Sequence, residues 1–283
     1  MALVPFPSQA PRPVPDDIDP DADYDGGSAS SAPEPEGDGR MSFLEHLDEL
    51  RKRIIWAVGS VFVGFIIAFA FITPIFEFIM RPLQSALPAG GTLVYTEPTE
   101  AFTLYIKIAA IAGLLIASPA VMTQVWLFIA PGLYSHEKRL AIPFIALSSS
   151  FFVLGAAFSH YIVFPMTWAF FVGFTTDYMT FMPRIDPAFG LYMKLLLAFG
   201  LVFQMPTLVL FLSKLGILTA RFMVKNLKYA VLLIFIAAAV LTPSGDAFVM
   251  TAMAAPMMGL YLLSIALAWL FGKKRTPPAA DDD

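Results

Sequence analysis

The chain has 283 residues, of which 58% are hydrophobic and only 14% are charged. Soluble domains carry roughly 45–50% apolar and about 25% charged residues, so the composition excludes an ordinary water-soluble protein. The chain has no cysteine, which excludes disulfides and thiolate metal sites, and its net charge of −4 gives no sign of a nucleic-acid partner.

The first forty residues differ from the rest of the chain. They hold nine acidic residues among proline, glycine, serine and alanine, with few bulky apolar side chains. Such a segment cannot bury enough surface to offset the entropy lost on ordering, so 1–40 is predicted to be a disordered tail. A wrongly assigned start is the alternative, because Met41 would open the folded part. The expected organisation is this tail, a membrane domain over 41–272, and a cytoplasmic tail over 273–283.

Six long segments with almost no charge follow the tail. A helix needs ~20 apolar residues to cross ~30 Å of hydrocarbon, and most of these segments reach that length. The sequence therefore predicts an all-α integral membrane protein with six transmembrane helices. The expected spans are 54–73, 106–130, 141–172, 188–212, 227–242 and 248–271.

Basic residues divide unequally between the two sides of these spans. Thirteen lysines and arginines fall on the side of the N-terminus, Arg12 not counted, and only Arg81, Lys107, Arg184 and Lys194 fall on the other. An excess of lysine and arginine marks the cytoplasmic face. Both termini are therefore expected in the cytoplasm.

Two parts of the predicted bundle are unusual. The first outer loop, 74–105, is long enough to hold short helices and is expected to fold against the spans as a cap. In the fifth span the uncharged run before a Thr-Pro-Ser-Gly break has only thirteen residues, Tyr229 to Leu241, and covers about 20 Å at ~1.5 Å per residue. A helix this short tends to thin the bilayer beside it.

Prolines interrupt several of the predicted spans. A proline removes a backbone donor and bends its helix, so kinks are expected at these positions. They are Pro119, Pro143, Pro165, Pro206 and Pro256.

The stretch before the first span forms an amphipathic pattern. Ser42 and Glu45 make a capping box, and the helix they start is expected to lie along the membrane interface before it turns into the bilayer. On this helix Glu49 can pair with Arg53 four residues later, as Asp48 can with Lys52, on a solvated face. The functional alternative is that Glu49 binds a cationic ligand.

The inner loop after the second span carries another acidic residue. Ser135 could cap the third span, which would place Glu137 in its first turn, where the helix dipole favours a carboxylate. In the alternative interpretation Glu137 and Glu49 converge on the same cationic ligand.

Five segments in the range 41–272 form an ordered set of motifs: 41–53 (MSFLEHLDELRKR), 124–139 (QVWLFIAPGLYSHEKR), 163–165 (VFP), 198–200 (AFG) with Phe203, and 241–246 (LTPSGD). In sequence and in order, these segments resemble the TatC family, the signal-peptide receptors of the twin-arginine translocase. The resemblance implies a concave, glove-like fold with six spans, the fifth and sixth of them short, in the bacterial inner membrane.

The resemblance also implies a function and a site. The chain would bind signal peptides that carry two adjacent arginines, and it would act with TatB-like and TatA-like single-span subunits in a homo-oligomeric complex driven by the proton-motive force. The two arginines would contact Glu49 and Glu137, and Arg51 would orient Glu49. Three residues would form the pocket wall: Phe128, Pro131 and Tyr134.

Three further positions match the family with weaker implications. Pro82 stands either in a family motif or in a helix-breaking turn, and Asp246 either caps the sixth span or contacts a partner subunit. Gln204 replaces a glutamate that many members carry in the fourth span, and it can hydrogen-bond a partner helix but cannot titrate.

The sequence also leaves a different function class open. A small-solute transporter or channel would need a polar site inside the membrane, for which Lys194 and Gln204 are the candidates. No serine-hydrolase elbow, metalloprotease motif or phosphate loop occurs in the sequence, and the three histidines are dispersed, so no enzyme activity, cofactor or metal is expected.

Overall fold

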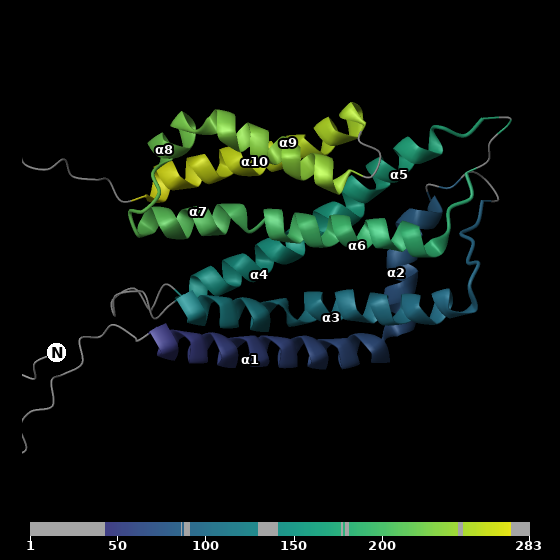
Figure 1. Ribbon diagram of the computed structural model, residues 1–283, viewed down its shortest axis with the longest axis horizontal. Helices are drawn as coiled ribbons and strands as arrows, with labels where there is room; N and C mark the ends of the chain where they lie inside the picture. Colours follow the sequence, from purple (N-terminus) through teal and green to yellow (C-terminus); the bar gives the residue numbers. More distant parts are fainter. Residues whose placement is uncertain are drawn as a thin grey trace, which may run out of the picture. The chain divides into compact units, whose positions relative to one another are not determined.

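The computed structural model describes residues 43–85, 87, 91–129, 141–176, 178, 181–242 and 246–272, and this part of the chain is helical apart from its connections (Figure 1). The predicted tails 1–40 and 273–283 lie outside it. The helices are α1 (Phe43–Ala70), α2 (Ile72–Ser85), α3 (Pro98–Ile129), α4 (Ala141–Phe158), the π-helical segment η3 (Ser159–Val163), α5 (Phe164–Val172), α6 (Ile185–Val202), α7 (Met205–Lys214), α8 (Ala220–Lys225), α9 (Leu227–Leu241) and α10 (Ala247–Phe271).

Each predicted span corresponds to one helix or to two or three helical segments that follow one another along the chain. Among the described residues, five helical stretches are long and apolar enough to cross a membrane: 44–70, 98–129, 142–172, 185–214 and 247–271. The sixth, α9, has 15 residues and is apolar but shorter. The prediction that the last span is also short is wrong, because α10 has 25 residues and extends about 37 Å.

Helices α1 and α3 pack closely against each other, and Figure 1 shows them side by side along their length. Two glycines face each other where the helices meet. A Cβ on Gly64 would lie 2.4 Å from the carbonyl oxygen of Gly113, and one on Gly113 would lie 2.5 Å from the backbone nitrogen of Phe65. Only glycine fits such a contact. The contact brings the N-terminal end of α1 beside the C-terminal end of α3.

Two of the five prolines for which a kink is predicted lie beside a change in the helical backbone. Pro165 follows the π-helical segment η3, and Pro206 follows a two-residue interruption at 203–204 between α6 and α7. In both places the backbone has rearranged beside a residue that cannot donate a hydrogen bond. Pro119, Pro143 and Pro256 lie in helices that continue without interruption.

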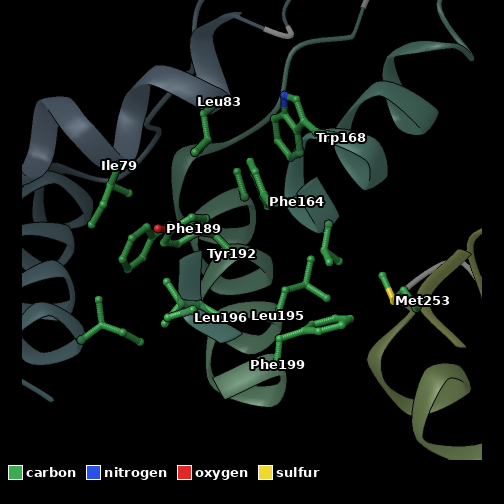
Figure 2. Close-up of a cluster of buried hydrophobic side chains, with 14 of the residues drawn as sticks. Ile79, Leu83, Phe164, Trp168, Phe189, Tyr192, Leu195, Leu196, Phe199 and Met253 are labelled. Atoms are coloured by element: carbon green, nitrogen blue, oxygen red, sulfur yellow. The ribbon is translucent and has the colours of Figure 1, made fainter. Parts of the chain in front are cut away.

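The largest hydrophobic cluster is centred on α6, where Phe189, Tyr192, Leu195 and Phe199 are almost completely buried. Other helices contribute the residues around them, as Figure 2 shows: Ile79 and Leu83 from α2, Phe164 and Trp168 from α5, and Met253 from α10. The first outer loop therefore does contain a helix that packs against the spans, as predicted.

Candidate functional site

Glu49 lies on the second turn of α1 with a side chain that is only 16% exposed. Arg53, one turn later, donates a hydrogen bond from Nη2 to Glu49 Oε1 at 3.0 Å, so the predicted i,i+4 pair forms. The second carboxylate oxygen, Oε2, is buried and has no hydrogen-bond partner in the described part of the chain. An ionised carboxylate accepts several hydrogen bonds, so Glu49 has unused capacity for one more donor.

Phe128, in the last turn of α3, stacks on His46 of α1 with ring centroids 4.5 Å apart and planes 21° apart. His46 and Glu49 are three residues apart, and residues at that spacing share a helix face. The packing of α1 on α3 therefore brings an aromatic ring of α3 to the part of α1 that carries Glu49. Two of the predicted site residues, Phe128 and Glu49, belong to one neighbourhood.

The other predicted residues of this site cannot be placed in it. Pro131, Tyr134 and Glu137 lie in 130–140, which is outside the described residues, so the convergence of Glu137 with Glu49 stays a prediction. Arg51 is exposed, and the residue that bonds Glu49 is Arg53 instead. Positions two residues apart on a helix point in different directions, whereas positions four apart meet.

The N-terminal segment of α1 also corrects one expectation. The amphipathic segment was expected to turn before it entered the bilayer, but α1 continues without a break from Phe43 to Ala70. No proline or glycine occurs between Leu44 and Val58 to interrupt the helix. Ser42, the predicted cap, lies outside the described residues.

Gln204 bonds within the chain. Its Nε2 donates to the backbone oxygen of Ser148 on α4 at 2.9 Å. The hydroxyl of Ser148 accepts a hydrogen bond from Trp126 Nε1 on α3 at 2.8 Å. These two bonds tie α3, α4 and the junction between α6 and α7 together, so Gln204 has a structural role whatever partner it contacts.

For Asp246 and Pro82 the structure tests one of the two predicted roles. Asp246 is the N-cap of α10, where Oδ1 accepts from the backbone nitrogens of Phe248 at 2.8 Å and Val249 at 3.3 Å. Pro82 lies inside α2, which continues to Ser85, so the prediction of a helix-breaking turn at Pro82 is wrong.

An ionic cluster that the sequence analysis did not predict joins the N-terminal part of α3 to the start of α6. Arg184 bonds Glu100 and lies 3.8 Å from Glu97, and Lys107 bonds Asp186. Backbone hydrogen bonds join Val94 to the same segment, from Val94 N to Pro183 O at 3.1 Å and from Ile185 N to Val94 O at 2.9 Å. The hydrogen bond to Glu100 holds the pKa of Arg184 above its usual value, so this cation stays charged.

A signal for this cluster was present in the sequence. Lys107 and Arg184 contributed only to the count of basic residues, although acidic residues, Glu100 and Asp186, occur close to each of them in the sequence. Since the bonded residues are 79 and 84 positions apart, only the packing of α3 on α6 pairs them.

The two candidates for a solute site do not form one. Lys194 is exposed on α6, whereas Gln204 bonds the backbone of α4. Ten residues separate them, about 15 Å along a helical path. The structure therefore gives the transporter alternative no shared polar site.

Comparison with known proteins identifies the family. The model of the family described as Sec-independent protein translocase protein (TatC) matches residues 45–256. A Koribacter versatilis protein, named Sec-independent protein translocase protein TatC, is 44% identical over 83% of this chain and 87% of its own length. A Helicobacter pylori protein of the same name is 38% identical over 84% of this chain and 89% of its own.

A solved structure agrees with these matches. The crystal structure titled Twin Arginine Translocase Receptor TatC superposes with a TM-score of 0.70 at 37% identity, covering 79% of this chain and 98% of that one. The family is a component of a protein translocase, not an enzyme, and its members are multi-pass membrane proteins. With an all-helical fold, five long apolar helical stretches and these relatives, the chain belongs to the TatC family.

Proposed function

We propose that this chain is the signal-peptide receptor of a twin-arginine translocase. The arginine pair would bind where the N-terminal end of α1, with Glu49, lies beside the C-terminal end of α3, with Phe128. The observation that carries the proposal is the second oxygen of Glu49, which is buried and unpartnered beside a pair with Arg53. A solved relative at 37% identity is titled a twin-arginine translocase receptor, which supports the same role.

The chemistry of the two groups matches. A guanidinium presents several N–H donors, and a single free carboxylate oxygen accepts a charge-assisted hydrogen bond from one of them. In the free protein Arg53 occupies one oxygen of Glu49, which holds the side chain in place and leaves the other oxygen for an incoming arginine. The second arginine would pair with Glu137 in the connection that follows α3.

Aromatic and apolar groups complete the proposed pocket. Phe128, fixed by its stack on His46, would present a ring face to a guanidinium, which is attracted to aromatic faces. Pro131 and Tyr134 follow Phe128 closely in the chain and would extend the same wall. Arg51 is exposed and would act on the approaching peptide rather than on Glu49.

The proposed topology has six spans, with α9 as the short fifth and both termini in the cytoplasm. Positive charge on the side of the N-terminus supports this orientation, because the excess of thirteen basic residues to four lies there. The Glu49 end of α1 is then cytoplasmic, where precursors are made. The membrane is the bacterial inner membrane, and the tails 1–40 and 273–283 would both be on its cytoplasmic side.

The remaining proposals concern the assembly. The receptor would present a concave, glove-like face to the apolar part of the signal peptide, and it would recruit TatB-like and TatA-like single-span subunits and further copies of itself for export driven by the proton-motive force. Pro82, Gln204 and Asp246 would support these contacts from α2, the α6–α7 junction and the α10 cap. Because Gln204 cannot titrate, no proton step is assigned to it.

The test is binding of a twin-arginine signal peptide to the purified full-length chain. Glu49→Gln removes the charge but keeps the size of the side chain, and Asp48→Asn is the matched control, because it makes the same change at the adjacent, exposed position. We expect Glu49→Gln to abolish the preference for paired arginines over paired lysines. We expect Asp48→Asn to keep it. Equal loss in both variants would mean that general negative charge, not Glu49, attracts the peptide.

A further inference from the structure

A cavity of about 510 Å³ lies between the segment 181–184, α5, α6 and the C-terminal end of α9. Its wall is mainly apolar and aromatic, and it includes Trp168, Phe181 and Leu241. Three charged residues also line it: Arg184, Asp186 and Lys194. A concave, largely apolar site with a few polar groups is the usual form of a ligand site.

The charges of the cavity do not balance. Asp186 is bonded to Lys107, and Arg184 is bonded to Glu100, so both already have partners. Lys194 lies nine residues into α6 and forms no ion pair within the described part of the chain. A cation inside a membrane span is costly, and such cations are found paired or in a polar pathway. The cavity therefore has one spare positive charge.

A second donor at the cavity wall has no acceptor. Trp168 is 3% exposed, and its indole Nε1 has no hydrogen-bond partner in the described residues. Figure 2 shows this nitrogen at the end of the ring that points away from the hydrophobic cluster. A buried N–H without an acceptor is unfavourable, but this nitrogen has almost no accessible surface, so Lys194 is the free group of the wall that favours a negatively charged acceptor.

The short helix α9 indicates where that acceptor comes from. Its 15 residues extend about 22 Å, less than the ~30 Å of a hydrocarbon core. A bilayer beside such a helix thins, which brings head groups of one leaflet toward the end of α9 at Leu241. Leu241 and Lys194 line the same cavity, so a phosphate drawn in at this point reaches the spare lysine.

We propose that this cavity binds the phosphodiester of a phospholipid, with Lys194 pairing the phosphate and the apolar wall contacting the upper part of the acyl chains. The bound lipid would keep the head groups of that leaflet close to the end of α9 and so determine where the bilayer is thin. This inference rests on the proposed crossing of α9 and not on the signal-peptide site.

The test uses the full-length chain in a neutral detergent and native mass spectrometry to measure bound dihexanoyl phosphatidylglycerol. The variants are Lys194→Gln, Lys194→Arg, and Lys225→Gln as a control at an exposed lysine of α8. We expect Lys194→Gln to weaken lipid binding about tenfold, because one charge-assisted bond is lost. Lys194→Arg and Lys225→Gln should bind as the wild type does.

Two further ligands separate the possible sources of the anion. Inorganic phosphate tests a free anion, and dihexanoyl glycerol tests the apolar part without a phosphate. The proposal predicts that neither displaces phosphatidylglycerol at equal concentration. Displacement by inorganic phosphate would assign the cavity to free anions, and displacement by the neutral lipid would leave Lys194 without a role; either result overturns the proposal.

The same preparations distinguish this inference from the receptor proposal. Unfolding temperature shows whether Lys194→Gln is folded, and signal-peptide binding shows whether the Glu49 site is intact. Unchanged lipid binding in a folded Lys194→Gln variant overturns the lipid site alone. A carboxylate of a partner helix is the competing occupant, and a crosslink from position 194 to a partner protein with no loss of lipid would favour it.

Discussion

The two ends of the α1–α3 pair treat their charges differently. At the end that holds the start of α3, here called the outer end, two ion pairs, Arg184–Glu100 and Lys107–Asp186, join α3 to the start of α6, which is distant in sequence. At the other end Glu49 pairs only with its own helix and keeps one oxygen unused. Charges satisfied between elements hold a fold together, whereas a buried acceptor with spare capacity is available to a ligand. The proposed receptive end is thus the one that keeps a carboxylate oxygen without a partner in the described residues.

The largest expected effect breaks the receptive end. Glu49→Gln should weaken binding of a twin-arginine peptide by about 30-fold or more, since removing one partner of a buried charge pair typically costs 2–5 kcal/mol. Titration of a labelled peptide measures this loss. A decrease below threefold would show that the unused oxygen of Glu49 does not receive the arginine.

The second effect concerns the close contact between α1 and α3, which positions the Glu49 site. Gly64→Ala places a Cβ 2.4 Å from a backbone oxygen and should destabilise the protein by about 1–3 kcal/mol through overpacking. Gly59→Ala, on the same helix with no neighbour within 4 Å, should be neutral or slightly stabilising. Unfolding in detergent compares the two variants. Equal stability would contradict the close packing.

A third prediction concerns the junction that Gln204 holds. Gln204→Leu removes the bond to the Ser148 backbone and should cost about 0.5–1.5 kcal/mol of stability. Gln204→Glu loses the amide donor as well, and it should destabilise the protein at neutral pH because a carboxylate would face a backbone carbonyl. Thermal unfolding of both variants measures the effect. A stabilised glutamate variant would show that the position accepts a charge.

A fourth prediction concerns the outer end. Arg184→Gln removes the cation that pairs with Glu100, a residue that is only 6% exposed. The variant should have a lower unfolding temperature and unchanged signal-peptide binding. The double variant Arg184→Gln with Glu100→Gln should recover part of the loss. Weaker peptide binding in the folded single variant would show that the outer cluster is not only structural.

The smallest effect distinguishes two arginines of α1. Arg53→Gln removes an i,i+4 pair worth a few tenths of a kcal/mol to the helix, but it also frees Glu49 to move, so peptide affinity should fall more than stability. Arg51→Gln should leave the position of Glu49 unchanged. Peptide titration beside unfolding curves makes the comparison. Identical affinities for the two variants would remove the orienting role of Arg53.

Local features were predictable where one stretch of chain decides them. Uncharged windows predicted the helices because crossing a bilayer depends on length and apolarity, and the spacing of Glu49 and Arg53 predicted their pair. The length of α10 was misjudged because the predicted short pair of spans came from a family likeness rather than from its own 25 residues.

Features that join distant segments were not predictable in this way. The bonds of Arg184 to Glu100 and of Gln204 to Ser148 depend on which helices pack together, and a single sequence does not state that. The π-helical segment before Pro165 was expected only as a kink, because a proline removes a donor without deciding how the backbone rearranges. The cavity at Lys194 likewise required the end of α9 to be placed beside α6.

The central claim is that Glu49 and Phe128 form one receiving surface for an arginine pair. A photoreactive residue at position 128 in the full-length chain tests it directly, with a signal peptide that carries either two arginines or two lysines. The account predicts an adduct with the arginine peptide that is lost with the lysine peptide and in Glu49→Gln, but kept in Asp48→Asn. An adduct of equal yield with both peptides, unchanged by Glu49→Gln, would contradict it.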